Sequence, residues 1–162
     1  MTRYLLFTSM LLAVVLDCAN VRADDLTRNP FLGTWEYDAA RSSFVGRAPY
    51  RSARLSFTAV ANGTRVVADI VVASGELFHF EYSGPEDGTF VAVSGNPYYD
   101  SASTVRRDAR TVIRTERRDG KAIGSTTMQV SEDGRLLTAS GRRTVPDGGL
   151  YTSVITWRRS GS

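Results

Sequence analysis

His79 is the only histidine in the 162-residue chain, and histidine is the ordinary side chain whose charge changes near neutral pH. Glu81 follows two residues later, so on a β-strand the two side chains would share one face. Such a pair could serve as a general acid and base, and a lone histidine could also bind a haem iron. Phe78 and Phe80 would then occupy the opposite face, and the alternative is that His79 lies on the outer surface. An exposed His79 would leave an enzymatic function without its main candidate.

The other reactive residue types form no catalytic or metal-binding pattern. A closed zinc site needs three or four protein ligands, and the chain has one histidine and one cysteine, Cys18. The serine motif Gly-x-Ser-x-Gly is absent. The adjacent carboxylates Glu86-Asp87 and Glu132-Asp133 fall in predicted turns. We therefore expect no catalytic residue, no metal and no cofactor.

Arginine supplies nearly all of the positive charge. Lys121 is the single lysine among 20 basic residues, and a guanidinium can hold a carboxylate or phosphate through two parallel hydrogen bonds. Residues 106–118 contain six arginines and only two acidic residues. If this stretch lines a cavity, Arg107 or Arg114 could bind the acidic head group of a ligand. The alternative is a genome that favours arginine codons.

The elements that must position these residues follow from an alternation of apolar and polar residues, which dominates from Arg51 onward. Residues 53–59 place an apolar side chain at every second position, which is typical of a half-buried strand. Dipeptides such as Asn62-Gly63 and Asp119-Gly120 suit the tight turns between antiparallel strands. We expect ten short strands, near residues 33–38, 52–60, 65–73, 76–82, 89–93, 103–108, 111–118, 121–131, 135–143 and 150–159.

Short strands joined by tight turns indicate an up-and-down meander. A sheet of this size either closes or leaves two exposed edges, and closure is the usual solution. The sequence therefore predicts an all-β protein, a closed up-and-down antiparallel β-barrel of about 8–10 strands. A sandwich with Greek-key connections is the alternative, and it would need longer loops. The residues predicted to line a ligand cavity inside the barrel are Phe57, Ile70, Phe78, Phe80, Tyr82 and Met128.

The segment Gly95-Asn96-Pro97-Tyr98-Tyr99-Asp100 is the most distinctive predicted loop. Proline interrupts strand pairing, and two adjacent tyrosines at the rim of a barrel could gate its mouth or contact a partner. We therefore add Tyr98 and Tyr99 to the candidate ligand-binding residues. The alternative is a turn that Asn96 and Asp100 stabilise.

The stretch Phe31-Leu32-Gly33-Thr34-Trp35, followed by Ser43-Phe44, resembles the start of the calycin barrels, which include the lipocalins and the fatty-acid-binding proteins. The resemblance implies that Trp35 packs across the closed end of the barrel and that Gly33 allows a neighbouring segment to approach. It also implies that a basic side chain from the end of the last strand, such as Arg158 or Arg159, stacks on Trp35.

The chain also departs from both branches of that superfamily. Residues 39–51 are too few for the two-helix lid of fatty-acid-binding proteins, and the sequence stops after its last predicted strand, where lipocalins have a helix. As a whole, the mature chain is similar to small secreted bacterial proteins with a lipocalin-like barrel. No particular ligand can be taken over from either branch.

The first 23 residues have the pattern of a signal peptide. Arg3 precedes an apolar run over residues 4–16, and Val21-Arg22-Ala23 offers small residues for cleavage before Asp24. The run is shorter than the roughly 20 apolar residues of a membrane span, so we expect no transmembrane segment in the mature chain. We expect secretion or a periplasmic location.

Cleavage would leave residues 24–162, a single domain of 139 residues without cysteine. Lipid anchoring at Cys18 is not expected, because the residue before it is the charged Asp17 and lipoprotein processing prefers a small neutral side chain. The predicted mature chain carries 18 basic and 16 acidic side chains, a net charge of +2. Nothing in this balance indicates a nucleic-acid partner.

Taken together, these features favour a secreted or periplasmic monomer that holds one small amphipathic or hydrophobic molecule in its barrel. The first alternative is a small barrel enzyme that uses His79 as acid or base. The second alternative is an envelope interaction module with a filled interior and an apolar surface patch around Tyr98 and Tyr99. The sequence identifies no partner protein.

Overall fold

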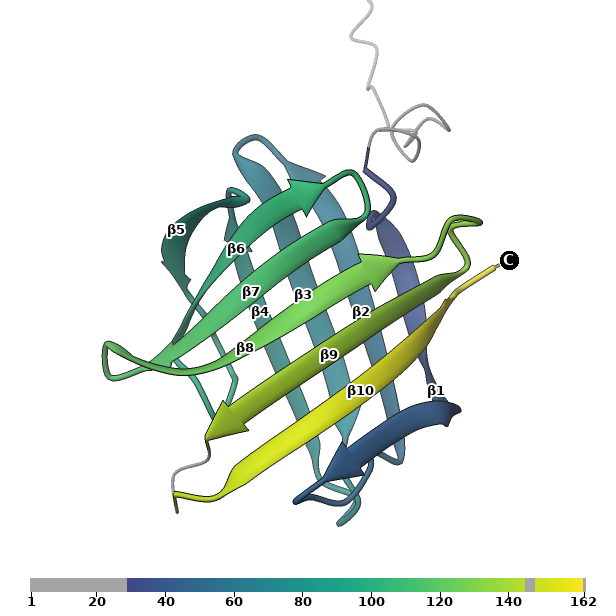
Figure 1. Ribbon diagram of the computed structural model, residues 1–162, viewed down its shortest axis with the longest axis vertical. Helices are drawn as coiled ribbons and strands as arrows, with labels where there is room; N and C mark the ends of the chain where they lie inside the picture. The colour runs from purple at the N-terminus through teal and green to yellow at the C-terminus, as the bar shows by residue number, and fades with distance from the viewer. Residues whose placement is uncertain (1–28, 145–147, 162) are drawn as a thin grey trace, which may run out of the picture.

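The computed structural model describes residues 29–144 and 148–161, and in these residues one sheet holds ten antiparallel strands (Figure 1). The predicted signal peptide, including Cys18, lies outside the described residues. The strands are β1 (Gly33–Val45), β2 (Ser52–Val60), β3 (Gly63–Val71), β4 (Leu77–Gly84), β5 (Asp87–Ala92), β6 (Ser101–Asp108), β7 (Thr111–Arg118), β8 (Lys121–Val130), β9 (Leu136–Thr144) and β10 (Leu150–Arg159). Except at the end of β1, these bounds agree with the predicted strands to within a few residues.

The sheet curls into a nearly closed barrel. Its order is β4-β3-β2-β1-β10-β9-β8-β7-β6-β5, so the first and last strands pair, and β4 and β5 form the two ends of the sheet. Among the described residues, one isolated bridge joins β4 to the segment just after β5, with N–O distances of 3.0 and 2.9 Å between Glu81 and Ser94. The topology confirms the predicted up-and-down barrel and excludes the Greek-key sandwich.

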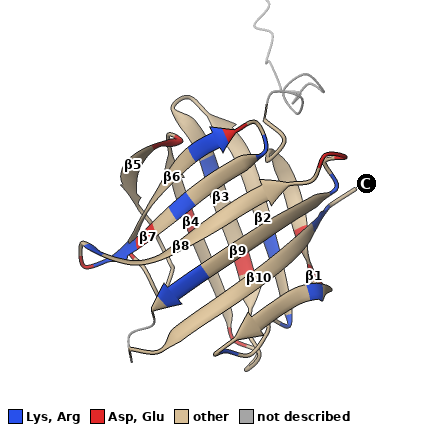
Figure 2. Ribbon diagram, viewed as in Figure 1, with Lys and Arg blue, Asp and Glu red and all other residues tan. Residues whose placement is uncertain are grey.

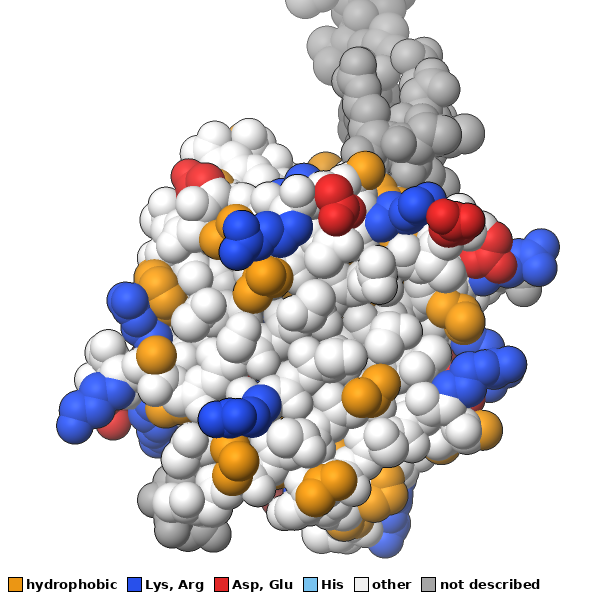
Figure 3. Space-filling model, viewed as in Figure 1, with side chains coloured by type: hydrophobic (Ala, Val, Ile, Leu, Met, Phe, Trp, Pro, Cys, Tyr) orange, Lys and Arg blue, Asp and Glu red, His pale blue; other side chains and the backbone are white. Residues whose placement is uncertain are grey.

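No α-helix occurs in residues 29–144 and 148–161, so this part of the chain contains no helix that could span a membrane. Charged positions in the ribbon view lie mostly toward the strand ends and in the turns (Figure 2). The outer face of β7–β10 in turn consists largely of uncharged polar residues, among them the exposed Thr127 and Ser140 (Figure 3). The apolar side chains lie mostly on the inward face of the barrel, where they form the core.

Asp119 and Gly120 form the turn between β7 and β8 that the sequence predicts. Both residues adopt positive φ, 50° and 74°, which is the backbone that a two-residue hairpin needs to match the twist of its strands. Gly95, in the loop before β6, has a φ of 76° and lies against the carbonyl oxygen of His79, which a Cβ atom would overlap. The absence of a Cβ at Gly95 therefore lets the loop 93–100 lie against β4, to which Ser94 is hydrogen-bonded through Glu81.

The first strand is longer than predicted because it continues past an irregularity. Its register against β10 shifts between Asp38 and Ser43, after which pairing resumes up to Val45. The buried Asp38 carboxylate accepts a 2.6 Å hydrogen bond from Arg41, and the Ser42 hydroxyl donates to the Asp38 carbonyl oxygen at 2.7 Å. Beyond the shift, β1 pairs with β10 but not with β2. A short loop, residues 46–51, then joins β1 to β2 at the mouth of the barrel, where Arg47 lies over the rings of Tyr98 and Tyr151.

Trp35 closes the opposite end of the barrel, as the resemblance to calycin barrels implies. Its side chain is fully buried, and its indole Nε1 donates a 2.8 Å hydrogen bond to the carbonyl oxygen of Phe31. The guanidinium carbon of Arg159 lies 4.1 Å from the centroid of the Trp35 ring. Arg159 also donates to the carbonyl oxygens of Leu32 and Gly134 at 2.6 and 2.8 Å. We call this end the base.

Candidate ligand-binding site

The inward residues of β7–β10 lie in four rows that change from polar at the mouth to apolar at the base. Strand registers place them as Glu116, Gly124, Arg143 and Tyr151; then Arg114, Thr126, Gly141 and Ser153; then Val112, Met128, Ala139 and Ile155; and last Val130, Leu137 and Trp157. Successive rows are about 6.7 Å apart along a strand. The interior is therefore amphipathic along the barrel axis.

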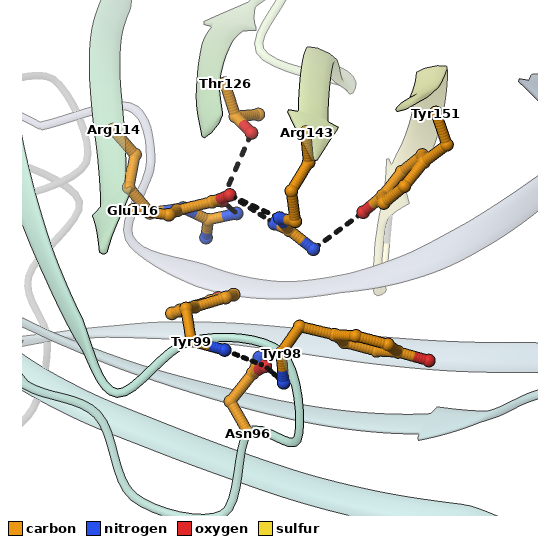
Figure 4. Close-up of polar contacts among 8 residues, drawn as sticks. All are labelled: Asn96, Tyr98, Tyr99, Arg114, Glu116, Thr126, Arg143 and Tyr151. Carbon is orange, nitrogen blue, oxygen red and sulfur yellow. Dashed lines mark hydrogen bonds and ion pairs between the residues drawn. The ribbon is translucent and has the colours of Figure 1, made fainter. Parts of the chain in front are cut away.

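Glu116 is the centre of the polar rows (Figure 4). Its side chain is fully buried, and one carboxylate oxygen accepts hydrogen bonds from Arg114 Nε at 3.0 Å and Nη2 at 2.8 Å. The other oxygen accepts from Arg143 Nε at 2.6 Å. Thr126 donates to the first oxygen at 3.3 Å, and Arg143 Nη1 donates to the Tyr151 hydroxyl at 2.6 Å. We call Arg114, Glu116, Arg143 and Tyr151 the arginine cluster.

The arginine cluster carries a net positive charge. Burial opposes ionisation of Glu116, but the charges of Arg114 and Arg143 outweigh that penalty and hold the pKa of its carboxyl below the ordinary value. Glu116 is therefore a carboxylate at neutral pH. In the described part of the chain it is the only carboxylate paired with either guanidinium. Two cations share one anion, which leaves a charge of +1 inside the barrel.

Tyrosine rings surround the arginine cluster and continue to the mouth. The guanidinium carbon of Arg143 lies 4.9 Å from the ring centroid of Tyr99, within cation–π range. At the mouth, Arg47 from the 46–51 loop lies over the rings of Tyr50, Tyr98 and Tyr151 at 5.0, 5.6 and 5.3 Å. Burial raises the pKa of Tyr50 to about 12, so its hydroxyl stays neutral at physiological pH. Arg47 has no carboxylate within ion-pair distance among the described residues.

The loop 95–100 is both a turn stabilised by a side chain and a segment that places two tyrosines at the barrel. Asn96 stabilises the turn, because its side-chain oxygen accepts from the backbone nitrogens of Tyr98 at 2.9 Å and Tyr99 at 3.3 Å (Figure 4). The same turn directs the Tyr98 and Tyr99 rings to the barrel, where they meet Phe78 and Phe80 edge to face. Tyr99 is buried. The apolar surface patch that the envelope-module alternative requires therefore does not include Tyr99.

A cavity of about 70 Å³ lies between these rings, the arginine cluster and the apolar rows. Pockets for drug-sized ligands measure roughly 300–1,000 Å³, whereas one water occupies about 30 Å³ of liquid. The space therefore suits a small molecule or a few waters. Its lining includes Tyr50 and Tyr151 at the mouth and Ile155 and Trp157 toward the base.

Seven of the ten predicted ligand-binding residues line this cavity: Ile70, Phe78, Phe80, Tyr98, Tyr99, Arg114 and Met128. Phe57 and Tyr82 are buried but border a smaller void of about 10 Å³ nearer the base. Arg107 is the wrong choice for a cavity residue, because it is exposed. Its neighbour Arg106 takes the inward position on β6, where its guanidinium contacts Glu86 and Phe31.

The site also contains residues that were not among those predicted, among them Arg47, Glu116, Arg143, Tyr151 and Trp157. Alternation on β9 and β10 could have placed Arg143 with Leu137 and Ala139, and Trp157 with Ile155. For Arg47 no sequence signal exists, because it lies in an irregular loop.

His79 lies outside the barrel. Its side chain is 54% exposed, and its Nδ1 lies 2.7 Å from an oxygen of Asp69. Glu81 pairs with Arg65 on the same outer face. His79 and Glu81, which were considered as the acid–base pair of an enzyme, therefore lie on the outer surface. They contact neither the cavity nor the arginine cluster. No group of three or more potential metal ligands occurs in the residues that the structure describes.

No protein-family model matches the chain, and no curated protein matches it. Among solved structures, the chain is similar to the zebrafish ileal bile acid-binding protein complexed with cholic acid, with a TM-score of 0.46 and 12% sequence identity. The aligned region covers 81% of this chain and 99% of the other. A likeness of this size does not bear on the ligand. The fold assignment rests on the strand pairing, which is consistent with the calycin-like barrel that Gly33 and Trp35 indicate.

Proposed function

We propose that this protein is exported and binds one small organic anion with an apolar body inside its barrel. The observation that carries the proposal is the arginine cluster, in which the largely buried Arg114 and the buried Arg143 share the single carboxylate of Glu116 beside a cavity. A carboxylate, sulfonate or phosphate group would be the second anion of this cluster.

Charge is the first support for an anionic ligand. Ions without partners are costly to hold in a low-dielectric interior, because the protein replaces only part of their hydration. An anion that enters the cavity would offset the remaining positive charge of Arg114 and Arg143. It would also accept charge-assisted hydrogen bonds, which are stronger than bonds between neutral groups.

The apolar rows support a ligand that has an apolar body. Met128, Ala139 and Ile155 line the cavity on the base side of the arginine cluster. A ligand whose acidic group meets the arginines would place its hydrocarbon part against these residues and remove it from water. The cavity volume favours a short chain or a single ring over a long acyl chain.

The proposed location comes from the sequence of residues 1–23, which has the charged, apolar and small-residue regions of a signal peptide. The absence of cysteine after residue 18 agrees with export, since such a chain has no thiol to be oxidised. Fractionation of cells that express the full chain, with N-terminal sequencing of the exported form, would test the location and the cleavage site.

Binding can be tested by calorimetric titration of the short-chain acid butanoate into wild type, Arg114→Gln and Arg107→Gln. Arg114→Gln leaves Glu116 paired with Arg143 and removes the surplus positive charge, whereas Arg107 is exposed and serves as the matched control. We expect binding to wild type and Arg107→Gln and at least a tenfold loss for Arg114→Gln, which corresponds to about 1.4 kcal/mol. Equal binding by all three proteins, or none by wild type, would overturn the proposal. Circular dichroism confirms that each variant is folded.

A further inference from the structure

Arg47 is a third arginine at the cavity, and the proposed function does not use it. It lies in the loop 46–51, apart from the strands that carry Arg114 and Arg143, yet all three residues line the same cavity. Within residues 29–144 and 148–161, no carboxylate lies at ion-pair distance from Arg47. Because Glu116 is the one carboxylate that pairs with the other two arginines in this part of the chain, the three arginines carry a surplus of two positive charges.

Three tyrosine rings position Arg47 at the mouth. Its guanidinium carbon lies 5.0, 5.6 and 5.3 Å from the ring centroids of Tyr50, Tyr98 and Tyr151, and all three tyrosines line the cavity. A guanidinium that lies over an aromatic ring keeps N–H donors for other partners, because it carries several of them in one plane. Arg47 is therefore held beside the cavity and is still able to bind an anion.

Tyr151 limits the distance between Arg47 and the arginine cluster. The guanidinium carbons of Arg47 and Arg143 lie 5.3 and 5.4 Å from the centroid of this one ring, and the sum of these distances, 10.7 Å, is the largest separation that the two carbons can have. Arg143 also donates to the Tyr151 hydroxyl at 2.6 Å, so it reaches the ring at its hydroxyl end (Figure 4). Because N–H···O contacts between ions measure about 2.7–2.9 Å, two carboxylates that pair with these guanidiniums would be joined through no more than roughly two carbon atoms.

We propose that Arg47 is a specificity-determining residue that binds a second acidic group of the ligand, so that the ligand is a short dicarboxylate or a similar small dianion. One carboxylate would meet the guanidiniums of the arginine cluster and the other would meet Arg47, with an apolar substituent of the ligand directed toward Met128. Two negative charges would offset both surplus positive charges, whereas a monoanion would leave one of them without a partner. This inference rests on the proposed function, because it assumes that the first acidic group binds at the arginine cluster.

The test compares malonate, a small dicarboxylate, with malonamate, which has the same number of non-hydrogen atoms but an amide in place of one carboxylate. Both are titrated calorimetrically into wild type, Arg47→Gln and Arg107→Gln at about pH 8, where carboxyl groups are ionised. We expect wild type to bind malonate about tenfold more tightly than malonamate, because hydrogen bonds to a charged acceptor are stronger than those to a neutral one. Arg47→Gln should remove this preference. Arg107→Gln, which removes an exposed arginine away from the cavity, should retain it.

The outcomes separate this inference from the proposed function. Equal binding of malonate and malonamate to wild type would overturn the inference, while butanoate binding that depends on Arg114 would leave the proposed function intact. A preference for malonate that persists in folded Arg47→Gln would also overturn the inference, because the second acidic group would then bind elsewhere. Failure of butanoate, malonate and malonamate alike to bind wild type would overturn the proposed function as well. If Arg47→Gln does not fold, a crystal structure of wild type with malonate decides by whether the second carboxylate contacts Arg47.

Discussion

Arg159 from the last strand lies over Trp35 from the first, with its guanidinium carbon 4.1 Å from the indole centroid. The contact joins the two strands that close the barrel, because Trp35 and Arg159 are also register partners of β1 and β10. Gly33 is needed beside them: its φ is 117°, and a Cβ atom would approach within 3.0 Å of the Arg159 guanidinium. The base of the barrel thus depends on a tryptophan, an arginine and the space that a glycine leaves.

Replacement of Trp35 by alanine should therefore lower the free energy of unfolding by about 3 to 5 kcal/mol, as for other buried large aromatic side chains. The loss includes the cavity, the Phe31 hydrogen bond and the contact with Arg159. Thermal unfolding checks this prediction, with wild type as reference. A melting temperature within a degree or two of wild type would show that Trp35 does not close the base.

Glu116→Gln should destabilise the protein by about 3 to 5 kcal/mol, because removal of the shared anion leaves Arg114 and Arg143 buried without a counter-charge. Urea unfolding measures the difference. Glu132→Gln is the matched control, since the Glu132 side chain is 90% exposed and its pairing with Arg110 lies in solvent. The account of the arginine cluster fails if the two variants unfold at the same urea concentration.

The Glu116 carboxyl predicts that the free energy of unfolding depends on pH. The pKa of Glu116 is lower in the folded protein than the ordinary 4.5, so protonation favours the unfolded chain. The stability that Glu116 contributes is therefore complete above about pH 4.5 and is lost as the pH falls through the folded-state value. Wild type should lose more free energy of unfolding between pH 6 and pH 3 than Glu116→Gln does. Parallel losses in the two proteins would contradict the assignment of an ionised, buried Glu116.

Arg47 should limit access to the cavity, because it lies over three tyrosine rings at the mouth. In a Trp35→Phe background the remaining fluorescence comes from Trp157, and acrylamide quenching of it should increase in Arg47→Ala. Arg54→Ala is the control, since the exposed Arg54 pairs with Glu36 on the outer surface. Unchanged quenching in the Arg47 variant would show that the loop 46–51 does not cover the mouth.

The strands and turns could be predicted from the sequence because both signals are local. Alternation of period two marks each half-buried strand, and dipeptides such as Asp119-Gly120 fix the hairpins by their positive φ. The continuation of β1 past Asp38 could not be predicted in this way. It depends on hydrogen bonds that Thr156 of β10 donates to the Ser42 hydroxyl oxygen and the Arg41 carbonyl oxygen, which form only when β1 lies against β10.

The site was predictable where alternation alone places a side chain inside, as for Phe80 and Met128. The ion pair of Glu116 with Arg143 was not, because the two residues are 27 positions apart and meet through the register of β7 and β9 on either side of β8. Arg107 shows the opposite case, because it was predicted to face the cavity and is exposed. A dense run of arginines indicates charge, but the face on which each one lies depends on a shift of one residue.

The central claim is that an organic anion binds inside the barrel at the arginine cluster. A crystal structure of the protein grown with butanoate tests it most directly. The account predicts a carboxylate within about 2.7–3.2 Å of guanidinium nitrogens of Arg114 or Arg143, with the chain directed toward Met128 and Ile155. A cavity that holds only water at a saturating concentration of the acid, or an acid bound only on the outer surface, would contradict it.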